Sequence, residues 1–208
     1  MDAFDFKGNL LSKSQQVISS STLKSSLDNY NTYLVDWTGL PSILDSNAFV
    51  TDNEYDALNR STKITLPEDV DANRKEIVPT YNRAGALEKV SYDSTEYVSN
   101  IAYNAKGQRL LIAFGNDVMT RYTYDNLTFR LKRMQSQKFT YSQVGDTHTY
   151  TVSSGTKRQD DAFDFDLVGN IVKKLIRVND CGINGSTLGS DALDRSFEYD
   201  PLYRVTSG

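Results

Sequence analysis

The chain of 208 residues contains a single histidine, His148, and a single cysteine, Cys181. A catalytic triad needs a positioned nucleophile and an orienting acid around its histidine. His148 instead lies in an alternating segment, residues 147–151, with no serine-elbow motif beside it. One imidazole and one thiol are too few for a histidine-rich or cysteine-rich zinc site. We therefore expect His148 to be an ordinary strand residue and Cys181 a small core or loop residue.

An acidic cluster suggests a calcium site. The run Asp164-Phe165-Asp166 followed by Gly169 partly matches an EF-hand loop. The match fails at two ligands, because Val168 stands where Asp or Asn is needed and Leu175 where the bidentate Glu is needed. We expect a solvated turn rather than a metal site among these residues: Asp160, Asp161, Asp164 and Asp166.

A second calcium-like spacing is formed by Asp69, Asp71 and Asn73, which fit the early ligand positions of the same loop. Arg74 replaces the invariant Gly, and Thr80 replaces the terminal Glu. This segment is also expected to be a solvated turn, so the sequence predicts no metal and no cofactor.

The remaining composition argues against an enzyme and against two classes of partner. None of the 27 Asp and Glu residues stands out as a paired acid and base, and the glycines form no phosphate-binding motif. A net charge of -4 gives no attraction to nucleic-acid phosphates or to an anionic membrane surface. The longest apolar run, residues 110–114, is far too short to span a bilayer. We expect no catalysis, no nucleic-acid partner and no membrane span.

One five-residue motif recurs along the chain. It consists of an aromatic residue, then Asp or Asn, two variable residues and a turn-permissive residue. Seven copies occur, with the central ones 21 to 26 residues apart. The copies begin with Phe4-Asp5 and its Gly8, Tyr55-Asp56 and Asn59, Tyr81-Asn82 and Gly85, Tyr103-Asn104 and Gly107, Tyr124-Asp125, Phe165-Asp166 and Gly169, and Tyr199-Asp200.

This spacing predicts a type I turn. The carboxylate or amide at the first turn position accepts hydrogen bonds from backbone N–H groups two or three residues on, and Gly suits the fourth position. Pro201 falls at the second position of its copy, where its fixed φ is already correct. The preceding aromatic ring would end a strand and pack on the sheet. Each motif is therefore expected to mark where one strand stops and the next begins.

Between the motifs the residue types alternate with period two, so that every second side chain lies on the same face, and this pattern predicts β-strands. Residues 110–114 and 118–124 flank Gly115-Asn116-Asp117, a connection of the type that hairpins need. A second hairpin is predicted for residues 138–142 and 148–152, and a further strand for residues 171–178. The fold class predicted is all-β, an antiparallel repeat-built sheet.

Two stretches do not follow this pattern. The Ser-rich segment at residues 12–26 has weak apolar spacing that suggests a short helix, and residues 67–76 are charged and suggest an exposed loop. We treat residues 1–208 as one repeat region whose least regular part is residues 12–46.

On these residues the chain resembles the YD-repeat or RHS-repeat family, and most closely the B/C-component shell of bacterial insecticidal toxin complexes. The resemblance extends from Phe4 to Arg204. It is carried by the runs at residues 55–60, 77–82, 101–109 and 122–131, in that order, and by Tyr199-Asp200-Pro201-Leu202-Tyr203-Arg204.

The resemblance implies a spiralling antiparallel sheet that closes into a hollow shell around a cargo polypeptide. In such families an aspartyl autoprotease and a variable effector follow the repeats. Asp200-Pro201-Leu202 is similar to part of the protease signature but lies inside a repeat copy and lacks the following Gly, so no catalytic role is carried over to it. The expected partners are the remainder of the RHS shell, its cargo and other toxin-complex components.

The resemblance thus implies that the chain is a structural fragment of a much larger secreted or cell-surface virulence assembly. No signal peptide is recognised at residues 1–6. The alternative is a free-standing carbohydrate-binding or cell-wall-binding module in which exposed Tyr rings stack on sugars. Loss of glycan binding in a folded Tyr103→Ala variant would favour that alternative.

Overall fold

The computed structural model describes residues 2–22, 38, 40, 42–145, 147–178 and 193–207. Cys181 and residues 23–26 of the Ser-rich segment lie outside these ranges, so the expectations for them are not addressed. Fifteen strands lie within the described residues. They are β1 (Ala3–Phe4), β2 (Leu10–Ile18), β3 (Leu44–Tyr55), β4 (Ser61–Glu68), β5 (Arg74–Tyr81), β6 (Leu87–Tyr92), β7 (Thr95–Tyr103), β8 (Arg109–Phe114), β9 (Val118–Tyr124), β10 (Leu131–Val144), β11 (Thr147–Phe165), β12 (Ile171–Ile176), β13 (Asp194–Ser196), β14 (Glu198–Tyr199) and β15 (Val205–Ser207).

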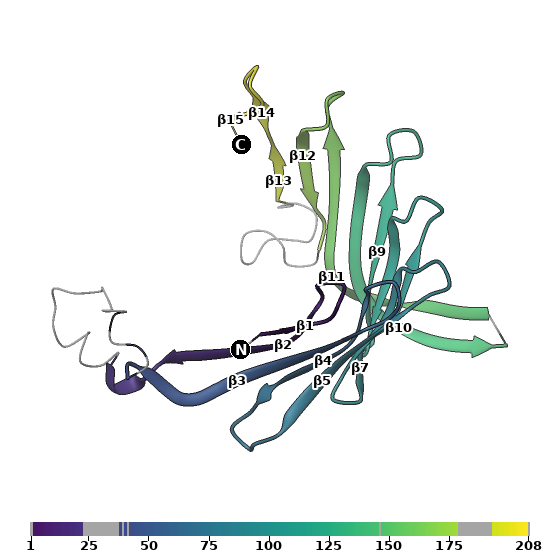
Figure 1. Cartoon of the computed structure of the whole chain (residues 1–208). Coiled ribbons are helices and arrows are strands. Elements are labelled where there is room, and N and C mark those ends of the chain that lie inside the picture. Colours follow the sequence, from purple (N-terminus) through teal and green to yellow (C-terminus); the bar gives the residue numbers. More distant parts are fainter. Residues whose placement is uncertain are drawn as a thin grey trace. The chain divides into compact units, whose positions relative to one another are not determined.

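Thirteen strands form one sheet in which the spatial order is the chain order, β1 to β13 (Figure 1). β14 and β15 form a separate two-stranded sheet. The strand pairs whose registers are described are all antiparallel. The all-β antiparallel fold predicted from the sequence is therefore confirmed. No helix among the described residues has the length and apolar character needed to cross a membrane.

The chain divides into two compact units. Unit 1 comprises Met1–Thr80 and Val90–Thr95, and unit 2 comprises Tyr81–Lys89 and Glu96–Gly208. The core lies in unit 2, where Ala113, Met119 and Phe139 form a buried cluster. Among the described residues five apolar side chains are buried, all of them in unit 2: Ile101, Ile112, Ala113, Met119 and Phe139.

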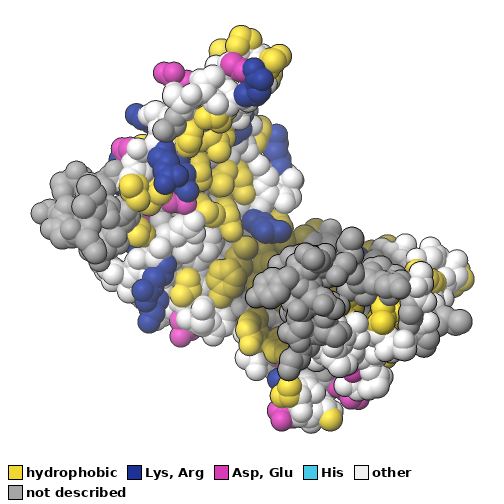
Figure 2. Space-filling model, turned by 90° about the vertical axis from the view of Figure 1, so that its left-hand side faces the viewer, with side chains coloured by type: hydrophobic (Ala, Val, Ile, Leu, Met, Phe, Trp, Pro, Cys, Tyr) yellow, Lys and Arg dark blue, Asp and Glu magenta, His cyan; other side chains and the backbone are white. Residues whose placement is uncertain are grey.

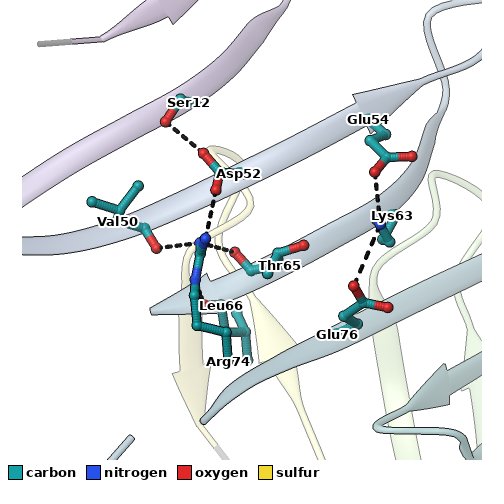
Figure 3. Close-up of polar contacts among 9 residues, drawn as sticks. All are labelled: Ser12, Val50, Asp52, Glu54, Lys63, Thr65, Leu66, Arg74 and Glu76. Carbon is teal, nitrogen blue, oxygen red and sulfur yellow. Dashed lines mark hydrogen bonds and ion pairs between the residues drawn. The ribbon is translucent and has the colours of Figure 1, made fainter. Parts of the chain in front are cut away.

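Polar side-chain contacts join the strands of unit 1, as Figure 3 shows. The pairing of β4 with β5 is irregular around Pro67, which cannot donate to the ladder. Arg74, the first residue of β5, bonds to carbonyl oxygens at this irregularity. Its Nε donates to Leu66 O at 3.0 Å, its Nη2 to Val50 O at 2.9 Å, and its Nη1 to Asp52 Oδ2 at 2.8 Å. One guanidinium therefore joins β3, β4 and β5.

A second cross-strand contact in unit 1 centres on Lys63. Its ammonium group lies 2.7 Å from Glu54 and 3.4 Å from Glu76, on the strands to either side (Figure 3). The hydrogen bonds to Glu54 and Glu76 raise the pKa of Lys63. Opposite charges on neighbouring strands thus stabilise the strand register in this unit, where few of the described apolar side chains are buried.

The predicted hairpins are confirmed. β8 and β9 flank residues 115–117, and β10 and β11 pair along their length, with Tyr141 opposite Tyr150 near the tip. The predicted strand at residues 171–178 corresponds to β12, which ends at Ile176.

Two expectations are correct only in part. Residues 12–18 belong to β2, which pairs with β3, and of the segment expected to hold a short helix only residues 20–22 are described as helical. Pairing with β3 outweighs a weak helical pattern, because strand formation depends on neighbouring strands more than on local propensity. Residues 67–76 are not one loop, since β4 continues to Glu68 and β5 begins at Arg74.

Candidate functional site

The recurring motif forms a compact turn, and the copy at Asn104 illustrates its geometry. The backbone N–H of Asn104 donates to Gln108 O, and that of Gly107 to Asn104 O, both at 2.9 Å. The side-chain Oδ1 of Asn104 accepts from Lys106 N and Gln108 N, both at 3.0 Å. A single side-chain oxygen therefore satisfies two backbone donors of the turn. We call such a turn a corner, from the Asp or Asn to the residue that closes it.

The same pattern of bonds to the residues two and four positions on recurs at five of the seven copies. In each copy the aromatic residue is the last residue of a strand, and the next strand begins directly after the corner. The motif spacing predicted bonds from residues two or three positions on. The bond to the fourth residue forms because the preceding residue has positive φ and turns the chain back toward the side chain. The five corners are residues 5–9, 56–60, 82–86, 104–108 and 200–204.

Two corners vary this pattern. The corner at Asp125 is one residue longer, and its carboxylate accepts from Leu127 N at 3.0 Å and Thr128 N at 2.8 Å. At Asp166 the carboxylate accepts from Gly169 N and Asn170 N, at 2.6 and 2.8 Å. In both corners the residue before the closing one, Phe129 or Gly169, still has positive φ.

Positive φ at the fourth corner residue explains why glycine recurs there. Gly107 has φ of 77°, and Gly85 has 83°. Asn59 and Tyr203 adopt 60° and 61° at the same position. Side chains other than glycine tolerate this region at a cost of about 1 kcal/mol, which explains why the motif varies there.

An eighth corner escaped the sequence analysis. The N–H of Asp69 donates to Asn73 O at 2.9 Å, and Asp69 Oδ1 accepts from Asp71 N and Asn73 N, both at 3.0 Å. Glu68 stands where the other copies carry an aromatic ring, so the motif did not predict this corner. The spacing of Asp69 and Asn73, matching Asp5 and Asn9, was the available signal.

The calcium interpretations of the two acidic clusters receive no support from the geometry. The oxygens of Asp69 bond to its own turn and to Lys75, whose Nζ lies 3.4 Å away. Asp160 pairs with Arg133 at 2.7 Å, and Asp161 lies 3.6 Å from Lys174. Within the described part of the chain, no group of three or more potential ligand residues could hold a metal ion.

The hydroxyl groups of the motif tyrosines connect successive corners. Tyr103 OH donates to Leu87 O at 2.8 Å, and Leu87 is the first residue after the preceding corner. Tyr55, Tyr124 and Tyr199 repeat this relation. Their hydroxyls donate to Leu10 O at 3.2 Å, Arg109 O at 2.9 Å and Ile171 O at 2.8 Å, respectively. The motif predicted only that the aromatic ring packs on the sheet, so it did not predict this role of the hydroxyl.

Phe165 has no hydroxyl, and its corner is connected to the preceding one differently. Arg130, the closing residue of the corner at Asp125, donates to Asp166 O and, at 3.0 Å, to Leu167 O. The guanidinium carbon also lies 5.8 Å from the centre of the Phe165 ring. An arginine from one corner thus substitutes for the tyrosine of the next.

Backbone hydrogen bonding stabilises the charged form of the corner aspartates. Bonds from Arg60 N to Asp56 and from Gly169 N to Asp166 are the largest influences, and they lower the pKa of both carboxyl groups. A carboxylate that accepts two or three N–H groups favours ionisation. The corners are therefore expected to loosen in acid.

Six of the seven motif corners join an odd-numbered strand of the main sheet to the next even-numbered strand. The seventh joins β14 to β15. Because neighbouring strands are antiparallel, the motif corners of one unit lie at the same end of the strands. We call this the corner end. The remaining connections among the described residues, which include the eighth corner at Asp69, lie at the opposite end.

The opposite end of unit 2 carries an aromatic pocket. It is a cavity of about 410 Å³ with lining side chains from β6 to β8, β10 and β11. His148 is one of them, and its Nδ1 lies 2.8 Å from Tyr141 OH. The structure thus places His148 on an exposed strand, bonded to a tyrosine.

Solved structures of other proteins share this fold. The chain matches the crystal structure of TcdB2-TccC3-Cdc42 with a TM-score of 0.67 and 21% identity, covering 98% of this chain and 9% of that one. The chain has the fold of a toxin-complex segment. The TcdB2-TccC3 structure matches with the same values, and a Photorhabdus luminescens Tc holotoxin pore with a mutated TccC3 matches with a TM-score of 0.66, 21% identity and 98% and 8% coverage. The chain therefore spans less than a tenth of the length of the chains it resembles.

No family model matches the sequence. No curated protein matches it either. At this identity the structural matches show the fold alone.

Proposed function

We propose that this chain is a wall segment of an RHS-type or YD-repeat shell that encloses a cargo polypeptide. The observation that carries the proposal is the open 13-stranded sheet, whose strands follow chain order. Hydrogen bonds from the hydroxyls of the motif tyrosines connect its successive corners. Such a sheet extends by adding hairpins at either edge. A closed shell would need more sheet than this chain supplies, in keeping with its match to 9% of the TcdB2-TccC3 chain.

The apolar surface supports this proposal. Few apolar side chains among the described residues are buried, and Figure 2 shows a band of exposed apolar side chains bordered by charged ones. On one face of unit 2 the half-buried side chains of Tyr122, Met134 and Ile176 lie in one cross-strand row, which the buried Asp161 interrupts between Met134 and Ile176. A contiguous exposed apolar surface indicates contact with another polypeptide. In a shell, cargo or adjoining wall would cover it.

The corner tyrosines favour the shell over a free-standing glycan-binding module. Tyr103 is half-buried and its hydroxyl is bonded to Leu87 O, so this residue acts within the sheet. A module that used these tyrosines would need ring faces and hydroxyls free for a sugar. The geometry gives them a structural use instead.

The proposed role includes no catalytic residue and no cofactor. We propose that the chain acts outside the producing cell as part of a secreted or surface assembly with other toxin components. Its shell partners would pair with the edge strands β1 and β13, because the backbone groups of an edge strand are free to form a further ladder.

The test is protection of a cargo. The chain would be expressed with the coding sequence that flanks it in its genome, and the purified product treated with proteinase K before and after denaturation in urea. A polypeptide that survives digestion only while the sheet is folded supports a shell. Complete digestion of every segment other than the sheet, in the folded sample, would contradict it.

A further inference from the structure

The aromatic pocket at the opposite end of unit 2 is built on an extended hairpin. β10 pairs with β9 only as far as Lys138, and beyond it residues 139–144 pair with β11 alone. Phe139, Tyr141 and Gln143 alternate along β10, and Tyr150 and His148 face them from β11. These side chains therefore share one face of the hairpin.

The phenylalanine and tyrosine rings of this face contact one another at tilted angles, and the His148 ring is stacked on Tyr141, with ring centres 5.9 Å apart. Phe139 and Tyr150 have ring centres 5.6 Å apart with a 52° tilt, and Tyr141 and Tyr150 have centres 5.3 Å apart with a 42° tilt. Phe139 is nearly buried, whereas Tyr141 is 48% exposed. The tilted rings offer π faces in more than one direction within the 410 Å³ cavity.

The hydroxyl groups of both tyrosines are already bonded. Tyr150 OH accepts from Asn100 Nδ2 at 2.8 Å, and Tyr141 OH lies 2.8 Å from both Gln143 Oε1 and His148 Nδ1. These bonds hold the rings in place. What the tyrosines present to a ligand is therefore mainly their π surface.

The rim of the pocket is acidic. Glu88, Glu96 and Asp117 line it, against one lysine, Lys89, which lies 3.5 Å from Glu96. Among the described residues, the side chains of Glu88 and Asp117 form no hydrogen bond or ion pair. Two carboxylates are thus left beside the rings, a combination that attracts a cation and repels an anion.

Elsewhere the chain covers aromatic rings with its own cations. Lys106 Nζ lies 3.0 Å from the centre of the Phe129 ring, and Arg130 and Lys75 lie near Phe165 and Tyr92. Within the part of the chain that the structure describes, no lysine or arginine lies over the three rings of the pocket. This aromatic surface is therefore available to a cation from outside.

From these observations we infer that the pocket binds an alkylated ammonium group, such as the trimethylammonium of choline. Alkylation favours this site because a methylated ammonium is weakly hydrated and gains from contact with ring faces, while the carboxylates balance its charge. The inference goes beyond the shell proposal and does not depend on it. The group could come from a free small molecule or from a lipid headgroup.

The test is titration of the 208-residue chain with choline chloride, followed by NMR or calorimetry. Saturable binding is expected in the wild type. Tyr141→Ala should weaken it about tenfold, and Glu88→Gln and Asp117→Asn should each weaken it several-fold without loss of the fold. Asn tolerates the positive φ of 60° at position 117, so that variant should remain folded. Tyr97→Ala, which removes a 57% exposed tyrosine outside the pocket, is the matched control and should bind normally.

Two further arms distinguish the ligand and its source. Cellotriose, a neutral saccharide, should not compete with choline. Binding to phosphatidylcholine vesicles in addition to choline would identify a headgroup as the source, whereas choline binding alone would identify a free cation. The inference is overturned by absence of saturable choline binding, by cellotriose binding that depends on Tyr141, or by choline binding that Glu88→Gln and Asp117→Asn leave unchanged.

Discussion

The two ends of the strands are built on different rules. At the corner end, one side-chain oxygen and one residue of positive φ recur with little change. At the opposite end only one corner is found among the described residues, at Asp69, and the other connections differ from it: the two-residue turn Asp93-Ser94, with φ of 48° and 65°, the three residues 115–117 and the tip of the long β10–β11 hairpin. The repeated end spaces the strands, while the variable end is free to differ in length and to carry the aromatic pocket.

The largest effect is expected at the opposite end, at Gly115. A Cβ there would lie 1.9 Å from the carbonyl oxygen of Glu96, so backbone must move to admit it. Gly115→Ala should lower the free energy of unfolding by about 3 kcal/mol. Chemical denaturation measures this loss.

Gly107→Ala is the matched control at the corner end. Its φ of 77° costs an alanine about 1 kcal/mol, but no atom lies within 4 Å of the added Cβ. Equal destabilisation by the two substitutions would show that close packing does not distinguish the ends.

Asp160, which lies on β11 away from both strand ends, should make the free energy of unfolding depend on pH in the acid range. Burial acts to raise the pKa of this carboxyl group, but hydrogen bonds from Arg133, Lys157 and Gln135 outweigh it and lower the pKa to about 2. Because the folded pKa lies below the unfolded value of about 3.9, the stabilisation is present above that value and is lost as the pH falls toward 2. The loss should be on the order of 2 kcal/mol.

Urea denaturation of the wild type and of Asp160→Asn between pH 5 and pH 2 measures this contribution. The variant should lose less stability across that interval than the wild type does. Some dependence on pH should remain, because the corner aspartates also have lowered pKa values. Identical pH profiles for the two proteins would rule out the role given to Asp160.

At the corner end, Asn104→Ala removes the acceptor of two backbone N–H groups. We expect a loss of about 1 to 2 kcal/mol, because these donors are left without their partner. Asn104→Asp keeps the acceptor and should be close to wild type. Thermal unfolding compares the three proteins, and an alanine variant as stable as the aspartate variant would contradict the corner geometry.

A smaller loss is expected from the link between corners. Tyr103→Phe removes the hydroxyl bonded to Leu87 O and should cost about 1 kcal/mol. Tyr203→Phe, at a tyrosine that is 58% exposed, should have no measurable effect. If both changes were neutral, the hydroxyl link would not stabilise the corner end.

The sequence predicted the strands well, because period-two alternation and the corner residues are local signals. It did not predict Arg74 or the Tyr103 hydroxyl contact, since both depend on which carbonyl the register brings alongside. The corner at Asp69 was not predicted because Glu68 replaces the aromatic residue of the motif. The aromatic pocket was also beyond reach, since its lining comes from five strands.

The most direct test is electron cryomicroscopy of the particle that forms when the chain is expressed with its flanking coding sequence. The account predicts a hollow particle in whose wall β1 and β13 pair with further strands and the exposed apolar surface faces cargo or adjoining wall. A solid particle, or an isolated sheet whose edge strands have no neighbours, would contradict it.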